Sequence, residues 1–285
     1  MKDVTNAMRA HILTAAVPYI KQYTDQYVVV KYGGNAMIDE ELKKSVMKDL
    51  MLLQLVGVKV VLVHGGGPAI NSTLDAMKIE SHFANGLRVT DELTMDVVQM
   101  VLAGKVNKGL VADLTDLGGK AVGLCGVDGN MIQVHKQNDE LGYVGSIDTI
   151  DTSIIDDVIS RGYIPVISSI GMGADGKTYN INADTVAAKI AGALKAETMV
   201  AMTNIDGVLR DVHDPSSLIS KITMAEADQL KAEGIIAGGM IPKVDCCLEA
   251  IKSGAQKVFI INGEIPHAIL IELLTDEGLG TMFVK

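Results

Sequence analysis

Tryptophan is absent from this 285-residue sequence, and proline (6) and cysteine (3) are scarce. Three cysteines, two of them adjacent at Cys246 and Cys247, do not fit a disulfide framework, so we expect a reducing compartment, the cytoplasm. The chain also lacks an apolar run of the roughly 18 residues that a membrane-spanning helix needs, and it lacks a secretory signal at its start. We therefore expect a protein that is neither exported nor inserted into a membrane.

Basic residues are fewer than acidic ones. The sequence has 25 Lys and Arg against 35 Asp and Glu, which gives a formal charge of −10. Such a surface is poorly suited to neutralise nucleic-acid phosphates or to hold anionic lipid, which excludes both classes of partner. The 29 glycines and the 48% hydrophobic content are typical of a globular α/β protein with glycine-rich loops. Any site for an anion must therefore be local.

Short apolar, β-branched runs alternate with longer amphipathic segments along the chain. The runs predict buried strands at Tyr27–Val30, Val58–Val63, Ala121–Cys125, Ile164–Ile170, Thr198–Met202 and Val258–Ile261. The segments predict helices at Glu40–Leu55, Pro68–Met77, Asp91–Leu117, Ser153–Ile159, Ala183–Leu194, Met224–Glu233 and Lys243–Ser253. This alternation predicts an α/β fold with an open, mainly parallel sheet covered on both faces, which binds ligands at the carboxyl ends of its strands.

A polar, glycine-rich region near Ile170–Lys177 separates a larger N-terminal part from a smaller C-terminal part. We place an N-terminal helix in residues 1–24, one lobe in residues 25–178 and a second lobe in residues 179–285. The helix, predicted over Asp3–Tyr23, carries apolar residues at helical spacing: Met8, Ile12, Leu13, Ala16, Val17 and Ile20. Two interpretations stay open, a helix packed on its own domain and an oligomer contact.

Two glycine-rich turns follow the first two predicted strands, at Gly33-Gly34 and at Gly65-Gly66-Gly67. A glycine turn between a strand and a helix presents backbone N–H groups to an anion, and glycine lets a phosphate approach closely. Two such turns in consecutive βα units favour a phosphate or carboxylate ligand over plain packing. Lys31 ends an apolar run just before Gly33, so its ammonium should reach the same space.

The segment from Gly171 to Thr178 satisfies both the P-loop pattern and the dinucleotide-binding pattern. Both patterns need a helix that begins at the end of the loop, whereas Tyr179–Asn182 consists of turn and strand formers. The dipeptide Asp175-Gly176 instead predicts a tight hairpin. We therefore interpret both matches as accidental.

Three further segments place polar groups after strands or before helices. Asn180, Asn182 and Asp184 precede the helical pattern Thr185–Leu194. An N-cap explains Asn182 or Asp184 alone, but three polar residues exceed what capping requires, so a ligand contact is the second interpretation. Thr203 and Asp206 follow the predicted strand Thr198–Met202. Lys243 opens a helix after a glycine turn, a position that the helix dipole disfavours for a cation unless an anion is nearby.

Taken together, five segments resemble the N-acetylglutamate kinases of the amino acid kinase family: Lys31–Asn35, His64–Pro68, Gly86–Thr90, Asn180–Asp184 and Met240–Lys243. The resemblance implies a three-layer αβα sandwich whose N-terminal lobe binds the acyl amino acid and whose C-terminal lobe binds MgATP. It also implies ATP-dependent phosphorylation of the γ-carboxylate of N-acetyl-L-glutamate, a step of arginine biosynthesis.

The same resemblance assigns roles to individual residues. Lys31 and Lys243 would stabilise the transferring phosphoryl group, and Asp184 would hold both lysines. The remaining positions are Gly66, Gly67, Arg88 and Asn180 for the acetylglutamate, Gly33 and Gly34 for the phosphate path, and Thr203, Asp206 and Lys243 for the nucleotide. No residue is assigned to Mg²⁺, which phosphates and water can hold.

The N-terminal helix and the segment Thr275–Met282 resemble the arginine-inhibited, hexameric branch of these kinases. By that resemblance, helices interlace dimers into a trimer of dimers, and L-arginine binds near Lys21, His267, Glu277 and Gly280. A PII signalling protein, which binds some relatives, is a further partner. Two alternatives stay open. One is an N-acetyl-aminoadipate kinase, whose substrate has one more methylene. The other is a non-catalytic amino-acid sensor, against which the intact Lys31, Asp184 and Lys243 argue.

Overall fold

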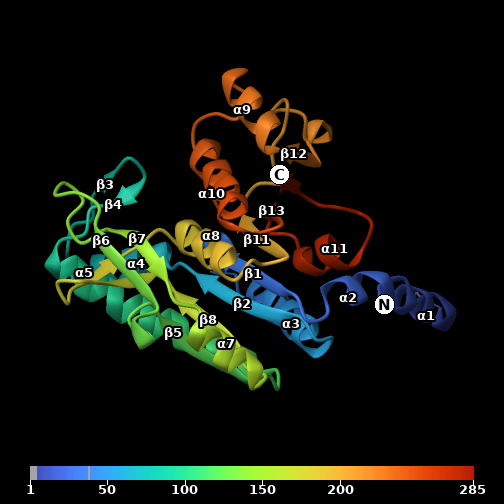
Figure 1. Cartoon of the computed structure of the whole chain (residues 1–285), viewed down its shortest axis with the longest axis horizontal. Helices are drawn as coiled ribbons and strands as arrows, with labels where there is room; N and C mark the ends of the chain where they lie inside the picture. The colour runs from blue at the N-terminus through green and yellow to red at the C-terminus, as the bar shows by residue number, and fades with distance from the viewer. Residues whose placement is uncertain (1–4, 38) are drawn as a thin grey trace.

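The computed structural model describes residues 5–37 and 39–285, and a sheet of eight strands runs through its centre (Figure 1). In spatial order the strands are β12 (Lys221–Thr223), β14 (Thr281–Val284), β13 (Lys257–Asn262), β11 (Thr198–Thr203), β1 (Tyr27–Tyr32), β2 (Lys59–His64), β8 (Ile164–Ser168) and β5 (Ala121–Cys125). Every neighbouring pair is parallel except β13 and β14. The mainly parallel sheet predicted from the sequence is confirmed.

Helices cover both faces of this sheet, as the alternation of its buried residues requires. Val29 of β1 packs into a core that α7 (Ser153–Ser160), α8 (Ala183–Ala193), α9 (Met224–Ala232) and α10 (Met240–Ser253) share. Val28 and Val30 point the opposite way, into a core shared by α2 (Val17–Tyr23), α3 (Glu40–Leu55), α6 (Asn107–Asp116) and α11 (Ala268–Leu274). The fold is therefore an αβα sandwich.

The strand order reverses at β1. Strand β2 lies on one side of β1, and β11 and β13 extend the sheet on the other side. Such a reversal of strand order leaves a crevice beyond the carboxyl ends of the two central strands. The crevice of this fold therefore lies beyond β1 and β11, where β1 ends in Lys31 and Tyr32.

Smaller elements lie on the side of the molecule away from the N-terminus (Figure 1). They are a four-stranded sheet of β10 (Thr178–Asn180), β9 (Ile170–Gly173), β6 (Ile132–Lys136) and β7 (Gly145–Ile150), and a hairpin of β3 (Phe83–Ala84) and β4 (Leu87–Arg88). The single strand predicted at Ile164–Ile170 was wrong, because the chain leaves β8 at Ser168 and enters this second sheet at Ile170. The tight turn predicted at Asp175-Gly176 is confirmed, with Gly176 at φ +76°.

The long helix predicted at Asp91–Leu117 contains a π-helical turn. It consists of α5 (Glu92–Gln99), the π segment η2 (Met100–Val106) and α6. The remaining elements are α1 (Asn6–Ala15), α4 (Gly67–Ala76) and the short 3₁₀ turns η1 (Gly34–Met37), η3 (Asp128–Asn130) and η4 (Pro215–Ser217). A π turn changes the phase of a helix, so it rotates α6 relative to α5.

Helices α8 and α10 pack side by side with a constant register. Thr185 Oγ1 lies 4.0 Å from Cys246 Sγ, and Lys189 Nζ lies 2.6 Å from Glu249 Oε1, at sequence separations of 61 and 60. One turn further on, a Cβ on Gly192 would lie 2.3 Å from the Cβ of Ser253. The two helices therefore run parallel, and α10 begins about one turn before the level at which α8 begins.

The N-terminal helix is broken at Ala16 into α1 and α2, and its predicted start at Asp3 lies outside the described residues. Helix α2 packs against α11, whereas α1 extends away from the body (Figure 1) and buries none of its residues. Met8, Ile12, Leu13 and Val17 are all more than half exposed. Within residues 5–37 and 39–285, no helix combines the length and apolar character needed to cross a membrane.

Candidate active site

A cleft of about 330 Å³ lies beyond the carboxyl ends of β1 and β2. Its lining includes eight of the residues to which the sequence analysis assigned roles: Lys31, Gly33, Gly34, Gly66, Gly67, Arg88, Asn180 and Asp184. Residues separated by more than 150 positions in the sequence therefore meet here. The cleft is thus rich in cations and in backbone N–H groups from glycine turns.

Lys31 and Asp184 form an ion pair that joins β1 to the start of α8. Lys31 Nζ lies 2.9 Å from Asp184 Oδ1, with the side chains 12% and 24% exposed. The ammonium also lies 3.5 Å from the carbonyl oxygen of Met202 at the end of β11. Lys31 therefore reaches across the crevice between the two central strands.

The N-cap of α8 is Asn182, not Asp184. Asn182 Oδ1 accepts hydrogen bonds from the backbone N–H groups of Asp184 at 2.8 Å and of Thr185 at 3.3 Å. Since capping uses the asparagine, the carboxylate of Asp184 is available to Lys31. This arrangement accounts for more than one polar residue at the start of this helix.

Lys243 lies in the first turn of α10, which begins at Met240, so the prediction that Lys243 opens the helix was wrong by three residues. The register of α8 and α10 sets Lys243 level with residues 182 and 183, beside the end of α8 that carries Asp184. Lys243 is half-buried and does not line the cleft itself. Its ammonium must extend from α10 to reach the Lys31–Asp184 pair.

Arg88 is a buried cation that faces the cleft. The residue is 7% exposed, Nη2 donates to Asn71 Oδ1 at 2.5 Å, Nη1 donates to Ser81 Oγ, and the guanidinium lies over the Phe83 ring. Burial lowers the pKa of the Arg88 guanidinium, and no carboxylate in the described part of the chain forms an ion pair with it. A buried charge is costly unless it is paired, so a ligand anion would complete this site.

Asn180 lies opposite, on β10. Its Nδ2 donates to Thr90 Oγ1 at 3.3 Å, and its backbone N–H donates to the carbonyl oxygen of Tyr143 at 2.9 Å. Both contacts fix the amide side chain at the edge of the cleft, where its oxygen stays available to a ligand donor.

The glycine turn after β2 lies on a buried polar pair that the sequence analysis missed. His64 is fully buried, its Nδ1 lies 2.9 Å from the Gly65 carbonyl oxygen, and its Nε2 lies 3.0 Å from Asn107 Nδ2. Asn107 Nδ2 also lies 2.8 Å from the Val166 carbonyl oxygen, and Lys108 Nζ donates to Asn107 Oδ1 at 3.1 Å. No local signal in the sequence marks this pair, because the helical periodicity does not reveal the π segment that precedes Asn107.

Burial lowers the pKa of His64 to about 4, with Lys108 as a further, repulsive cause. The unfolded chain, with a pKa near 6.5, binds this proton first, so stability is full above pH 6.5 and is lost as the pH falls toward 4. We expect the free energy of unfolding to fall by about 2 kcal/mol more in the wild type than in His64→Gln between pH 7 and pH 5. Urea unfolding of both proteins at the two pH values measures this difference, and equal losses would contradict a neutral His64.

The nucleotide-side residues lie on a different part of the molecule. Asp206 accepts a hydrogen bond from Asn262 Nδ2 at 2.8 Å and lines a cavity of about 410 Å³ that extends to Met240 at the start of α10. Thr203 does not line this cavity; its hydroxyl donates to the Ile205 carbonyl oxygen at 3.1 Å and accepts from the Ile205 N–H. Thr203 therefore shapes the loop that carries Asp206.

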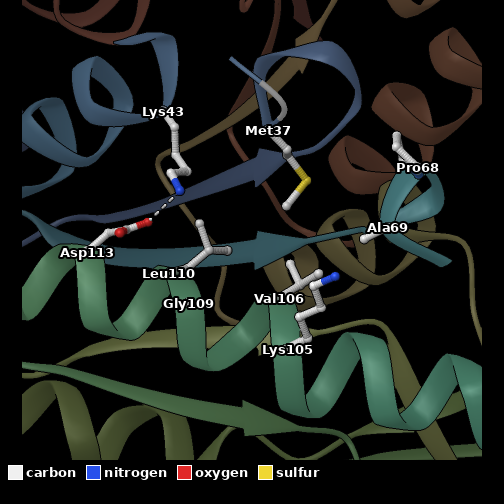
Figure 2. Close-up of a pocket in the computed structure, with 10 residues that line it drawn as sticks. Met37, Lys43, Pro68, Ala69, Lys105, Val106, Gly109, Leu110 and Asp113 are labelled. Carbon is white, nitrogen blue, oxygen red and sulfur yellow. Dashed lines mark ion pairs between the residues drawn. The ribbon is translucent and has the colours of Figure 1, made fainter. Parts of the chain in front are cut away.

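Gly66 also lines a smaller cavity of about 220 Å³. Figure 2 shows other residues of its lining. The cavity is bounded by Met37, by Pro68, by Val106 and by an ion pair in which Lys43 Nζ lies 3.2 Å from Asp113 Oδ2. Gly66 thus separates this cavity from the main cleft, because it lines both. A Cβ at this position would lie 2.6 Å from Leu102 Cδ2, so any larger residue would have to displace this buried side chain.

The four residues assigned to arginine lie on two neighbouring elements, α2 with Lys21, and α11 with its flanking segments. His267 precedes α11 at φ +62° and its Nδ1 lies 2.6 Å from Asp49 Oδ1, whose pKa burial raises to about 6. Glu277 is exposed, and Gly280 is buried against β13. The cavity that includes His267 is lined by residues of α3 and includes none of the other three.

Within the described ranges, no group of three or more His, Cys, Asp or Glu side chains is arranged to hold a metal ion. Asp184, an acidic residue in the lining of the cleft, is paired with Lys31. The cleft therefore offers the cations Lys31 and Arg88 and the amide of Asn180 to an anion.

Proteins of known function resemble this chain over most of its length. Residues 26–262 match the amino acid kinase family. The chain is 52% identical to the acetylglutamate kinase of Brachyspira hyodysenteriae over 287 residues, covering 100% of both chains, and 54% identical to that of Clostridium kluyveri over 275 residues, covering 96% and 97%.

Among solved structures, the N-acetylglutamate synthase of Neisseria gonorrhoeae in complex with coenzyme A and N-acetyl-glutamate matches with a TM-score of 0.84 at 28% identity, covering 97% of this chain and 63% of that one. The same synthase with coenzyme A and L-arginine matches with a TM-score of 0.80 at 25% identity, covering 97% and 65%. The carbamate kinase of Giardia lamblia bound to AMP-PNP shares the fold, with a TM-score of 0.65 at 17% identity, covering 91% and 98%. This chain is therefore an enzyme of the amino acid kinase family, in the branch that holds the acetylglutamate kinases.

Proposed function

We propose that this enzyme transfers the γ-phosphoryl group of ATP to the γ-carboxylate of N-acetyl-L-glutamate, in the arginine-biosynthetic pathway of the cytoplasm. The observation that carries the proposal is Arg88, a buried guanidinium that faces the same cleft as Lys31 and the glycine turns and has no acidic partner among the residues that the structure describes. A planar guanidinium binds a carboxylate bidentately, so Arg88 would receive the α-carboxylate of the substrate. Gly66, Gly67 and Asn180 would contact the rest of the molecule.

The chemistry needs no general base, because a γ-carboxylate with a pKa of about 4.3 is ionised at pH 7. The difficulty is electrostatic, since an anion must approach a polyphosphate. Lys31 and Lys243 would stabilise the charge on the transferring group, and Asp184 would orient the two lysines. Gly33 and Gly34 would direct backbone N–H groups along the phosphate path.

The lobe formed by residues 25–178 would hold the acyl amino acid, and residues 179–285 would hold the nucleotide in the cavity that Asp206 lines. Thr203 would act through the loop rather than through direct contact. Mg²⁺ would arrive with ATP, held by phosphates and water, since we assign it no side-chain ligand.

The test is ADP formation from MgATP with N-acetylglutamate, and in parallel with N-acetyl-aminoadipate. We expect turnover with N-acetylglutamate, and a lower kcat/KM for the longer substrate, by the roughly 10- to 200-fold that one methylene in a fitted pocket can give. Preference for N-acetyl-aminoadipate would reassign the substrate. Absence of turnover with both, while arginine still binds, would favour the sensor.

Lys243→Ala should lower kcat by about tenfold to thirtyfold, with little change in KM. The expected loss is smaller than for a fully enclosed cation, because Lys243 is half-buried and water screens part of its charge. Lys252→Ala, which removes an exposed lysine from the other end of α10, is the matched control. Near-normal turnover of Lys243→Ala would remove this lysine from the mechanism.

We further propose that L-arginine inhibits the enzyme by binding near Lys21, His267, Glu277 and Gly280, and that α1 joins dimers into a hexamer. Exposure of four large apolar residues on α1 and at the start of α2 supports the oligomer contact, and the related synthase that was solved with L-arginine supports the ligand. Inhibition of ADP formation by arginine, together with a hexameric mass by light scattering, tests both. A PII protein would be a further partner, to be tested by co-sedimentation.

A further inference from the structure

The buried pair His64–Asn107 lies directly beneath the glycine turn that lines the cleft, yet neither side chain lines the cleft itself. Its polar atoms form an ordered chain: Lys108 Nζ to Asn107 Oδ1, Asn107 Nδ2 to His64 Nε2, and His64 Nδ1 to the Gly65 carbonyl oxygen. A buried polar network at 0% and 1% exposure costs free energy unless every member is satisfied.

The partners of the two ring nitrogens of His64 decide which nitrogen donates. The Gly65 carbonyl can only accept, so His64 Nδ1 carries the proton. Asn107 Nδ2 can only donate, so His64 Nε2 presents its lone pair. The imidazole is therefore neutral and fixed in one tautomer, which agrees with a pKa that burial lowers to about 4.

The Nδ1–H tautomer of His64 fixes the orientation of the peptide between Gly65 and Gly66. The bond between Gly65 and Gly66 is trans, so its N–H points opposite to its C=O. Because His64 draws the Gly65 carbonyl oxygen toward the protein interior, the Gly66 N–H points away from the imidazole, and Gly66 itself lines the cleft. In the described part of the chain this N–H has no backbone acceptor, as is typical of the start of a helix.

We propose that His64 and Asn107 are positioning residues, which hold the Gly65–Gly66 peptide so that the Gly66 N–H donates to an anionic oxygen of the substrate. The role rests on the proposed phosphoryl transfer. Two other features serve the same end. The π segment brings Asn107 to the inner face of the helix, and Gly123 leaves room for it, since a Cβ there would lie 1.8 Å from Asn107 Oδ1.

Two substitutions of His64 separate positioning from packing. In His64→Asn, the side-chain amide nitrogen takes the place of Nδ1 and can still donate to the Gly65 carbonyl oxygen. In His64→Gln, the amide oxygen takes the place of Nε2 and accepts from Asn107 Nδ2, so that no donor occupies the place of Nδ1. Both replace a buried imidazole by a smaller amide, so both should lower the unfolding midpoint in urea to a similar extent.

We expect His64→Gln to lower kcat/KM for N-acetylglutamate by about thirtyfold, and His64→Asn to retain activity within about threefold of the wild type. Equal losses in the two variants, in proportion to their unfolding midpoints, would reduce the pair to a packing role and overturn the proposal.

The tautomer is also directly observable, whatever the substrate. With six histidines in the chain, ¹⁵N-histidine labelling of the full-length protein gives a resolvable imidazole spectrum, in which the signal missing from His64→Gln identifies His64. We expect the Nδ1–H form between pH 6 and pH 9. An Nε2–H form would overturn the proposal even if the enzyme is active, whereas an inactive wild type with the Nδ1–H form would overturn the proposed function alone.

Discussion

Replacing Lys31 by Met should lower kcat by about 10³-fold, with KM for both substrates changed by less than about threefold. Methionine keeps most of the apolar stem of the lysine but removes its charge. Lys31 is 12% exposed and paired with Asp184 at 2.9 Å, so its charge acts in a medium of low dielectric, where a cation beside a transferring phosphoryl group has its largest effect. Steady-state ADP formation measures both constants.

Lys59→Met is the matched control for this variant. Lys59 lies on the neighbouring strand β2, at the opposite end of the same sheet, where its ammonium lies over the Tyr27 ring. Its loss should leave kcat within about twofold of the wild type. A Lys31→Met enzyme with near-normal kcat would show that phosphoryl transfer does not depend on this cation.

The second large effect is expected at Arg88. Arg88→Lys should raise KM for N-acetylglutamate by about tenfold and Arg88→Met by about a hundredfold, with a smaller change in kcat and in KM for ATP. Lysine keeps the positive charge but offers a point donor instead of the planar fork that matches a carboxylate. Asn71 and Ser81, which now orient the guanidinium, would be left without that partner in either variant.

Arg161→Met provides the control, because Arg161 ends α7 at an exposed position outside the cleft. It should leave both KM values unchanged. If KM for N-acetylglutamate in Arg88→Lys equals that of the wild type, Arg88 does not bind the α-carboxylate, and the unpaired cation needs another ligand.

The central sheet was predictable because its strands are buried on both faces and therefore appear as continuous apolar runs. Lys31 and the two glycine turns could be placed together for the same reason, since parallel neighbours end at one edge of the sheet. The hairpin with Arg88 was not predictable in this way. Its strands have two residues each, too few for a pattern, so Arg88 entered only through the resemblance.

The pair His64–Asn107 escaped prediction for a different physical reason. Its two members are 43 residues apart, and a helix read at a constant 3.6 residues per turn from Asp91 to Leu117 carries no sign of the π turn at residues 100–106. That turn sets which face of α6 points inward. The pairing of His64 with Asn107 is thus a property of the tertiary structure that local periodicity does not encode.

The parallel register of α8 and α10 limits how this enzyme can be redesigned. One residue inserted between Lys243 and Cys246 would turn the lysine by about 100° around the helix axis and shift it by about 1.5 Å, while every contact further along the two helices stayed intact. Such a protein would fold normally and yet present its lysine to solvent. A chimera with another enzyme must therefore keep the number of residues between Lys243 and Cys246. The loops around the two helices can be exchanged.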